Sequence, residues 1–435
     1  MALTFSGGIH ADDCKITENC PIIDMPEPKT VSIPMSQHIG LPCEPIVSVG
    51  DNVKKGQKIG ENINGLSSYI HSSISGKVKA IETRLDNNGK KIKCIVIEND
   101  FKSEVCENIL PFNKKITDTT TEEIIEIVKN AGIIGMGGAA FPSHAKIASA
   151  INKADTLIIN CSECEPYITA NHRLLLESPE KVIGGAKIIL KALNISTGFL
   201  AVEDNKPTAI KILNELLKND SLLSVKVLKT KYPQGDERQL IYAIKKKELP
   251  AGKLPADLGC VIFNAETTAS IFTAFSTGMP IVNRIVTVSG NCIAKPQNVR
   301  VPIGTSFSDV IDFCGGFTTE PDKVVSGGPM MGFAQWDIST PVVKGTTAIL
   351  ALSEVCDEKN VSNCIHCGRC INVCPMHLMP LYFAAYAKKE NYLRCNEYNV
   401  LSCVECGCCT YICPGKVPIV QYIRTAKAKI REQKR

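Results

Sequence analysis

Cys364-Ile-His-Cys-Gly-Arg-Cys-Ile-Asn-Val-Cys-Pro375 and Cys403-Val-Glu-Cys-Gly-Cys-Cys-Thr-Tyr-Ile-Cys-Pro414 carry one cysteine spacing twice near the end of the chain. Each stretch follows Cys-x2-Cys-x2-Cys-x3-Cys-Pro, the pattern of bacterial 4Fe-4S proteins, in which the fourth cysteine of one run binds the cluster of the other run. The spacing therefore predicts two 4Fe-4S clusters. The expected ligands are Cys364, Cys367, Cys370 and Cys413 for one cluster, and Cys374, Cys403, Cys406 and Cys409 for the other.

Other uses of cysteine fit this pattern less well. Zinc sites favour one Cys-x2-Cys pair answered by another pair at a distance. Disulfides need an oxidising compartment, whereas the chain begins Met-Ala-Leu-Thr-Phe without a basic and then apolar signal segment. Eight of the 21 cysteines belong to the two runs, and the others are scattered without ligand spacing, which fits a reducing cytoplasm. We interpret Cys408, beside a predicted ligand, as a packing residue.

Length and composition indicate several packed domains. The 435 residues suffice for about three or four domains at ~100–200 residues each, and a hydrophobic content of 44% is ample for their cores. The net charge of +5 is only mildly basic, so no nucleic acid partner is implied. No apolar stretch approaches the ~20 residues that cross a bilayer. We expect a soluble protein, or one held at a membrane by other subunits.

Part of the positive charge gathers at the C-terminal end. The residues concerned are Arg424, Lys427, Lys429, Arg431, Lys434 and Arg435. We interpret this basic tail as a solvated helix end; contact with acidic lipid headgroups or with an acidic partner is the alternative.

Changes in pattern divide the chain into four predicted domains, and the expected fold class is multidomain α/β. The predicted boundaries are 1–110, 111–279, 280–350 and 351–435. The first and third domains have β character, and the last is helical around the cysteine loops. In the second, apolar strands such as 156–160 alternate with helical patterns such as 180–193. This alternation predicts an α/β unit with a largely parallel sheet.

A glycine-rich segment in the second domain indicates a phosphate site. Gly135-Met-Gly-Gly-Ala-Ala-Phe-Pro142 contains Gly135, Gly137 and Gly138 and is followed by Lys146. Backbone N–H groups of such a loop can approach a phosphate closely, and the N-terminus of a following helix adds a favourable dipole. The spacing is not that of an NTPase loop. Taken alone, the segment is also compatible with a plain tight turn.

Three further segments place polar residues at predicted strand ends and turns. They contain Asn160, Glu163 and Glu165; Gly235, Asp236 and Glu237; and Asn264 and Thr267. Because ligands of open α/β sheets bind at the carboxyl ends of strands, we expect these side chains to face one crevice beside the glycine loop. If the segment with Asn160, Glu163 and Glu165 stood alone, a solvated acidic turn would be the preferred interpretation; the other two segments make chance less favoured.

In this order, the four segments resemble the flavin and NADH site of the flavoprotein subunit of respiratory complex I. With the doubled cysteine run and the N-terminal region, the whole chain resembles the C subunits of the Rnf family, the ferredoxin:NAD oxidoreductases of bacterial membranes. The resemblance implies that Gly135, Gly137 and Gly138 shape the FMN phosphate loop and that Lys146 holds the phosphate. It further implies that Asn160 bonds the flavin ring and that Asn264 and Thr267 complete the FMN cradle.

The same resemblance implies that Glu163 and Glu165 contact the nicotinamide nucleotide and that residues 235–237 line its pocket. This sequence departs from the complex I pattern at three positions, where Met136 replaces Arg, Ala140 replaces Gly and Ser162 replaces Asp. Losing the Arg removes a cation from the nucleotide side, so FMN binding is better supported than the individual NADH contacts.

The two β regions also resemble known modules. Residues 47–60 and 70–78 resemble a biotinyl or lipoyl-type hammerhead, but no lysine lies between Gly60 and His71 to carry a swinging arm. We therefore expect a structural module. Residues 282–332 resemble a β-grasp module of the soluble-ligand-binding type. A tight-turn role is the default interpretation of Gly327, Gly328 and Gly332, and a close approach of the backbone to the flavin domain is the alternative.

The resemblance implies an NAD(H)-reacting subunit of a membrane-bound, ion-translocating ferredoxin:NAD+ oxidoreductase. Hydride would pass between NAD(H) and FMN, and single electrons through the two 4Fe-4S clusters, with no catalytic acid or base needed. Electrons from ferredoxin would arrive through other subunits of the membrane complex, which places the chain at the cytoplasmic face of the bacterial cell membrane as a peripheral subunit. The alternatives are a soluble NADH-dependent corrinoid reductase of microcompartments and an iron–sulfur electron wire without flavin.

Overall fold

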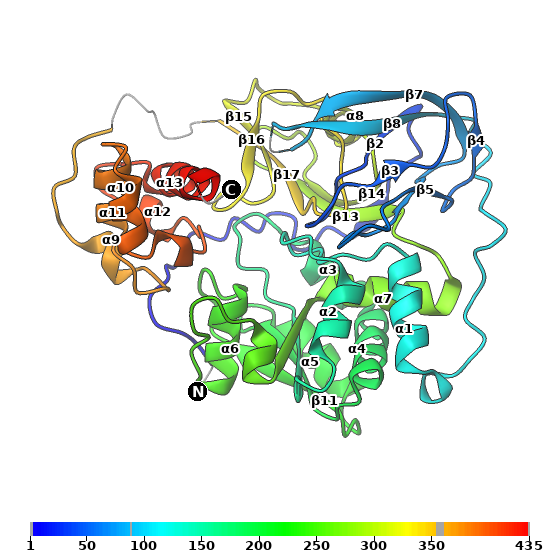
Figure 1. Cartoon of the computed structure of the whole chain (residues 1–435), viewed down its shortest axis with the longest axis horizontal. Coiled ribbons are helices and arrows are strands. Elements are labelled where there is room, and N and C mark those ends of the chain that lie inside the picture. Colours follow the sequence, from blue (N-terminus) through cyan, green and yellow to red (C-terminus); the bar gives the residue numbers. More distant parts are fainter. Residues whose placement is uncertain (1–2, 88, 354–360, 434–435) are drawn as a thin grey trace.

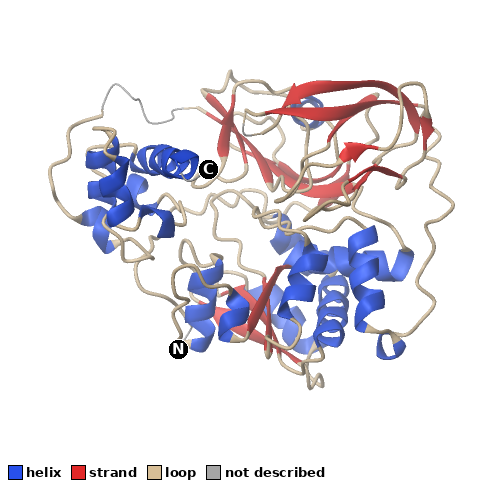
Figure 2. Cartoon of the chain, viewed as in Figure 1, coloured by secondary structure: helices blue, strands red, loops and turns tan. Residues whose placement is uncertain are grey.

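The computed structural model describes residues 3–87, 89–353 and 361–433. An α/β part lies below a β-rich part in Figure 1, and the C-terminal helices form a separate body beside both. Figure 2 shows the same division, with strands concentrated in the upper part and helices around the lower sheet. Within the described residues, no helix is both long enough and apolar enough to cross a membrane.

The α/β part contains a four-stranded sheet in the order β11-β10-β9-β12, and every neighbouring pair is parallel. Its strands are β9 (Thr156–Asn160), β10 (Gly198–Glu203), β11 (Leu223–Leu228) and β12 (Cys260–Asn264). Apolar runs such as Thr-Leu-Ile-Ile are buried because helices cover both faces of a parallel sheet. The structure confirms the predicted parallel sheet and the predicted strand at 156–160.

Seven helices of the described residues surround this sheet. They are α1 (Thr121–Asn130), α2 (Ser143–Ala150), α3 (Ala170–Glu177), α4 (Pro179–Leu193), α5 (Pro207–Leu216), α6 (Glu237–Lys245) and α7 (Ala265–Thr277). Helix α1 begins with a capping box, in which the Thr120 and Glu123 side chains bond each other's backbone N–H groups. Helices α4 and α7 cross so closely that a Cβ on Gly185 would collide with the Thr268 carbonyl oxygen.

Two small sheets form the N-terminal β region. One has the order β2-β8-β7-β4 and the other β3-β5-β6. The strands are β2 (Thr30–Pro34), β3 (Glu44–Pro45), β4 (Asn52–Val53), β5 (Lys58–Glu61), β6 (Ile70–His71), β7 (Gly76–Leu85) and β8 (Lys91–Asn99). Their inner faces share one apolar core that includes Ile33, Ile59 and Ile97. The short 3-10 helix η1 (Ile116–Asp118) follows before α1.

A six-stranded mixed sheet has the order β1-β14-β13-β17-β15-β16. Its strands are β13 (Asn283–Ser289), β14 (Gln297–Pro302), β15 (Lys323–Ser326), β16 (Phe333–Gln335), β17 (Ala348–Leu352) and β1 (Ile22–Asp24), with α8 (Phe307–Phe313) packed on it. Strand β1 pairs in parallel with β14, although about 270 residues separate them in sequence. The segment that precedes the N-terminal β region in sequence therefore belongs to the sheet of a later module.

The C-terminal body consists of short helices around the cysteine loops. These are α9 (Arg369–Asn372), α10 (Pro380–Ala387), α11 (Tyr392–Glu397), α12 (Cys408–Tyr411) and α13 (Ile419–Gln433), and the 3-10 helix η4 (Val400–Ser402) lies among them. Another 3-10 helix, η2 (Pro255–Leu258), belongs to the α/β part, just before β12. Phe383, Cys395 and Ile423 are fully buried in its core.

Residues 3–20, which we call the N-terminal strap, connect the C-terminal body to the α/β part. Leu3 forms a bridge to Leu228, and Ile9 forms one to Tyr232. The Gly8 N–H donates to the Val373 carbonyl at 2.8 Å. The strap thus touches the α/β part and a cysteine loop within a few residues.

We predict that Gly185→Ala destabilises the α/β part by about 1–3 kcal/mol, because the added methyl group overpacks the α4–α7 crossing. Gly345→Ala is the matched control, since a Cβ there meets no atom within 4 Å. Thermal unfolding followed by circular dichroism measures both. Equal melting temperatures for the two variants would contradict this packing.

Candidate functional site

The glycine loop lies against the carboxyl end of β12. The Met136 N–H donates to the Thr267 hydroxyl at 2.8 Å, and a Cβ on Gly137 would stand 3.4 Å from the Asn264 side chain. Asn264 caps α7 by accepting the N–H groups of residues 266 and 267 at 2.9 and 3.3 Å. The structure therefore brings the predicted glycines together with Asn264 and Thr267.

Lys146 projects from the first turns of α2 toward the same strand end. Its Nζ donates to the Ile262 carbonyl at 2.9 Å and pairs with the Glu237 carboxylate at 3.1 Å. The tip of the loop is open on the other side, because a Cβ on Gly138 would meet no atom within 4 Å. Lys146 and the glycine loop thus both lie against the end of β12.

The turn before α6 meets the end of β9. Asn160 donates through Nδ2 to the Gly235 carbonyl at 2.8 Å and accepts the Ser162 N–H at 3.0 Å. Asp236 caps α6, and burial raises the pKa of its carboxyl group above the usual range. The predicted residues of these two segments are therefore neighbours.

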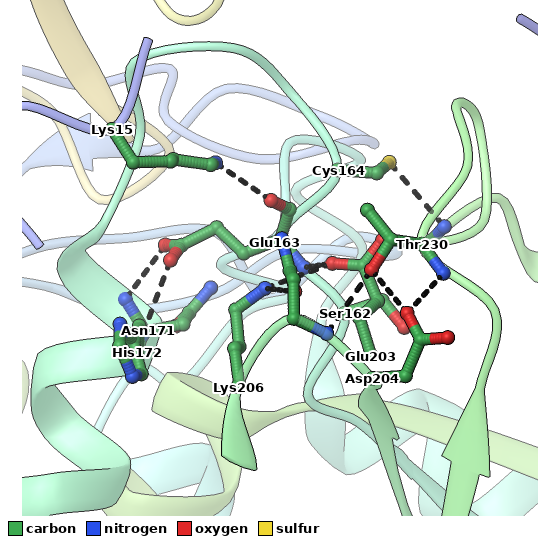
Figure 3. A network of polar contacts seen from close by, with 12 residues as sticks. Lys15, Ser162, Glu163, Cys164, Asn171, His172, Glu203, Asp204, Lys206 and Thr230 are labelled. Atoms are coloured by element: carbon green, nitrogen blue, oxygen red, sulfur yellow. Dashed lines mark hydrogen bonds and ion pairs between the residues drawn. The ribbon is translucent and has the colours of Figure 1, made fainter. Parts of the chain in front are cut away.

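Glu163 has a different environment from the one that its predicted nucleotide contact requires. Its carboxylate accepts the N–H groups of Asn171 and His172 at 2.7 and 3.1 Å, at the start of α3 (Figure 3). Its own N–H donates to the carboxylate of Glu203 at 3.0 Å. The Glu163 carboxylate is thus engaged by the protein, and its contact with a nucleotide stays a prediction.

Lys15 and Lys206 complete this polar network, and no sequence pattern singled out either residue. Lys206 pairs with Glu203 at 2.9 Å, and both side chains are almost fully buried. Lys15, from the N-terminal strap, donates to the Glu163 carbonyl at 2.8 Å (Figure 3). It also donates to the carbonyl groups of Glu165 and residue 168 at 2.7 and 2.6 Å. The strap therefore holds the turn that carries both predicted glutamates.

Glu165 contacts the glycine hairpin of the six-stranded sheet. Its carboxylate accepts the N–H groups of Met330 and Met331 at 3.1 and 3.0 Å, and a Cβ on Gly328 would collide with it. The close approach of this hairpin is therefore observed. Burial raises the pKa of the Glu165 carboxyl group to about 7, although both N–H groups favour the charged form.

The second predicted cysteine set surrounds a single cavity. Cys374, Cys403, Cys406 and Cys409 line it together with apolar residues such as Phe383 and Ile423. Burial raises the pKa of the Cys409 thiol, and Cys406, Cys403 and Cys374 raise it further through their charges. The fourth cysteine of the first run therefore lies with the three cysteines of the second run.

The first predicted set lies further out. Cys364 and Cys367 are exposed. Burial raises the pKa of the Cys370 thiol, and the charges of Cys364 and Cys413 add to that effect, so Cys413 is a neighbour of the first run.

Over the described ranges, no three His, Cys, Asp or Glu side chains converge closely enough to hold one metal ion. A cubane places its thiolates wider apart, because each sulfur binds a different iron. Four thiols around an apolar cavity fit such a group.

Tyr232 links the cavity of the second set to the strand-end residues. Its hydroxyl donates to the Cys406 carbonyl at 2.7 Å and lies 3.5 Å from the Glu165 carboxylate. Gln239 of α6 donates to the Pro375 carbonyl at 3.2 Å. Cys408 is fully buried in a small core with Ile9 and Tyr232, as expected of a packing residue.

Comparison with known proteins gives matches to four family models. They are the RnfC barrel sandwich hybrid domain (residues 3–102), the Nuo51 FMN-binding domain (128–273), the SLBB domain (285–334) and a 4Fe-4S dicluster domain (363–417).

The C subunits of three translocating complexes are similar to this chain over most of its length. That of the Na+-translocating ferredoxin:NAD+ oxidoreductase complex of Acetobacterium woodii is 46% identical, over 99% of this chain and 98% of that protein. The chain belongs to the RnfC family.

The other two members of the RnfC family come from different bacteria. The one from the proton-translocating ferredoxin:NAD+ oxidoreductase complex of Clostridium ljungdahlii is 46% identical, over 90% of this chain and 86% of that protein. The one from the ion-translocating oxidoreductase complex of Rhodobacter capsulatus is 40% identical, over 100% of this chain and 84% of that protein. The expected resemblance to the C subunits of the Rnf family is therefore confirmed.

We predict that Glu165 makes stability depend on pH. Its pKa rises from 4.5 to about 7 on folding, so the folded chain binds this proton more tightly than the unfolded chain. The resulting stability is complete below about pH 4.5 and falls by roughly 3 kcal/mol as the pH rises to about 7.

The Glu165→Gln variant lacks this titration. Its melting temperature relative to the unchanged protein should rise from about pH 5 to about pH 7 and then level off. Thermal unfolding at a series of pH values measures the difference. A difference that does not vary with pH would contradict the assignment.

Proposed function

We propose that this chain is the NAD(H)-reacting subunit of an ion-translocating ferredoxin:NAD+ oxidoreductase, the activity named for its relatives. The observation that carries the proposal is the contact of Tyr232 with the Cys406 loop, because it joins an FMN-binding type of domain to a dicluster domain in one chain. FMN, when bound, supplies the exchange between two-electron hydride transfer and one-electron transfer.

In this proposal the glycine loop and α2 hold the FMN phosphate. The backbone N–H groups of Gly137 and Gly138 face it, and Lys146 provides the positive charge. Gly135 shapes the loop, because its N–H donates to the Phe141 carbonyl at 2.8 Å. Asn160, Asn264 and Thr267 orient the flavin, and their bonds to neighbouring backbone groups support this role, because those bonds fix the side chains in advance.

The nicotinamide nucleotide lies beside the flavin, near Glu165 and residues 235–237. Glu165 is the stronger candidate of the two glutamates for this contact, because Glu163 is only 5% exposed, whereas Glu165 is partly exposed. Asp236 caps α6 and Glu237 pairs with Lys146, so both shape the pocket wall. No side chain is required as a catalytic acid or base.

Two 4Fe-4S clusters, when bound, would supply one-electron carriers. Cys374, Cys403, Cys406 and Cys409 hold the inner cluster, next to the flavin domain, and Cys364, Cys367, Cys370 and Cys413 hold the outer one. The exposure of Cys364 and Cys367 supports electron exchange with another subunit at the outer cluster. Ferredoxin reacts with the complex through such a partner, and ion translocation belongs to the membrane subunits.

The finer structural assignments belong to the same proposal. The domains extend over residues 1–110, 111–279, 280–350 and 351–435, with the N-terminal strap as an excursion from the first. The third is a β-grasp module, and the N-terminal hammerhead is structural. The chain lies at the cytoplasmic face of the cell membrane as a peripheral subunit.

The two alternatives are not favoured. Relatives that match nearly the whole chain are named as subunits of translocating complexes rather than as corrinoid reductases. A match to an FMN-binding domain over residues 128–273 disfavours an electron wire without flavin.

Anaerobic reconstitution tests the proposal directly. The purified chain is loaded with iron, sulfide and FMN and then given NADH and a viologen dye. We expect bound FMN and NADH-dependent reduction of the dye. A chain that binds no FMN and reduces no dye would leave the electron wire as the better function.

We predict that Lys146→Ala weakens FMN binding by roughly ten- to a hundredfold, the usual worth of a charge-assisted hydrogen bond. Lys153→Ala, at an exposed lysine just after α2, is the control and should bind FMN normally. Flavin fluorescence titration measures both affinities. Unchanged affinity in Lys146→Ala would show that the phosphate lies elsewhere.

We predict the pairing of the cysteine runs from iron content. The unchanged chain should hold about eight irons, Cys374→Ser with Cys403→Ser about four, and Cys374→Ser with Cys364→Ser close to none, because the last pair damages both clusters. Cys408→Ser is the control and should keep about eight. If each run instead binds its own cluster, the two double variants exchange their results.

A further inference from the structure

Helix α13 turns one lysine of the basic tail inward, against the loop that carries Cys403. The Nζ of Lys427 donates to the Cys403 carbonyl at 2.9 Å and pairs with the Glu405 carboxylate at 2.5 Å. Among the lysine and arginine side chains described between residues 361 and 433, Lys427 is the one that is buried, at 6% exposed. The expectation of a solvated helix end is wrong for this residue.

Arg424, one turn earlier, is also taken up by contacts within the protein. It pairs with Glu405 at 3.2 Å, donates to the Met331 carbonyl at 3.2 Å and lies 4.7 Å from the centre of the Phe333 ring. Two cations therefore share one carboxylate, which leaves one net positive charge behind the cysteine loop.

Two backbone N–H groups add further positive charge near the sulfurs of the second cysteine set. The Glu405 N–H donates to the Cys403 sulfur at 3.3 Å, and the Leu378 N–H donates to the Cys374 sulfur at 3.3 Å. Reduction of a cluster adds one negative charge, so nearby cations and N–H donors favour the reduced state, and burial strengthens their effect.

We propose that Lys427, held in place by Glu405, is a positioning residue that raises the reduction potential of the inner cluster. The inference rests on the proposed function for the presence of the two clusters. A higher potential would favour an electron on the inner cluster, beside the flavin domain. Two electrons together with one proton would make up one hydride.

The test is a redox titration of the reconstituted full chain, followed by electron paramagnetic resonance. In Lys427→Met we expect one of the two midpoint potentials to become more negative and the other to stay unchanged. Lys427→Arg keeps the charge and should keep the potential. Lys429→Met is the matched control, because Lys429 lies on the same helix but is exposed and pairs with Glu432.

In Glu405→Gln we expect the midpoint potential to shift in the direction opposite to that in Lys427→Met. Removing the carboxylate leaves two uncompensated cations, so the same potential should become more positive, whereas a merely structural defect would not reverse sign between the two variants. If Lys427→Met fails to take up iron, the midpoint potentials of Glu405→Gln and Lys427→Arg still test the proposal. A potential that does not move in Glu405→Gln, or moves the same way as in Lys427→Met, overturns the proposal.

The titration can be run without FMN or NADH. Unshifted potentials would therefore not bear on the NADH-dependent dye reduction. If the dye is not reduced, the midpoint potentials can still be measured.

Discussion

The hydrogen bond from the Tyr232 hydroxyl to the Cys406 carbonyl, at 2.7 Å, is the contact on which the proposed electron route depends. Tyr232 is buried with Ile9 and Cys408 in a small core, and a hydrogen bond shielded from water in this way is stronger than an exposed one. The same hydroxyl lies 3.5 Å from Glu165. One side chain thus touches both the Glu165 carboxylate and the Cys406 loop, which holds the α/β part against the C-terminal body.

Buried charges around this junction are paired rather than solvated. Glu203 pairs with Lys206, and Lys15 satisfies three carbonyl groups of the turn that carries Glu165. Such groups are costly to bury unless partners are present, so the N-terminal strap is needed to complete the turn. Lys427 and Arg424 are likewise paired with Glu405, and Lys427 also donates to the Cys403 carbonyl.

Much of the fold followed from local patterns. Strand β9 and helix α4 match the predicted segments within one residue, because apolar periodicity reports burial directly. The site residues were predicted as a set, since strand ends of a parallel sheet meet at one edge. The direction of single side chains was not predictable: Glu163 faces α3, and Lys427 faces inward, because packing against distant segments decides such orientations.

The sequence by itself determined the two cysteine runs, the parallel sheet and the glycine loop, because each depends on spacing over a few residues. The tertiary structure alone decided which elements meet: β1 with β14, the strap with the cysteine loop, and α13 with Glu405. These contacts join residues far apart in the chain, and their free energy comes from burial and charge pairing that no local pattern encodes.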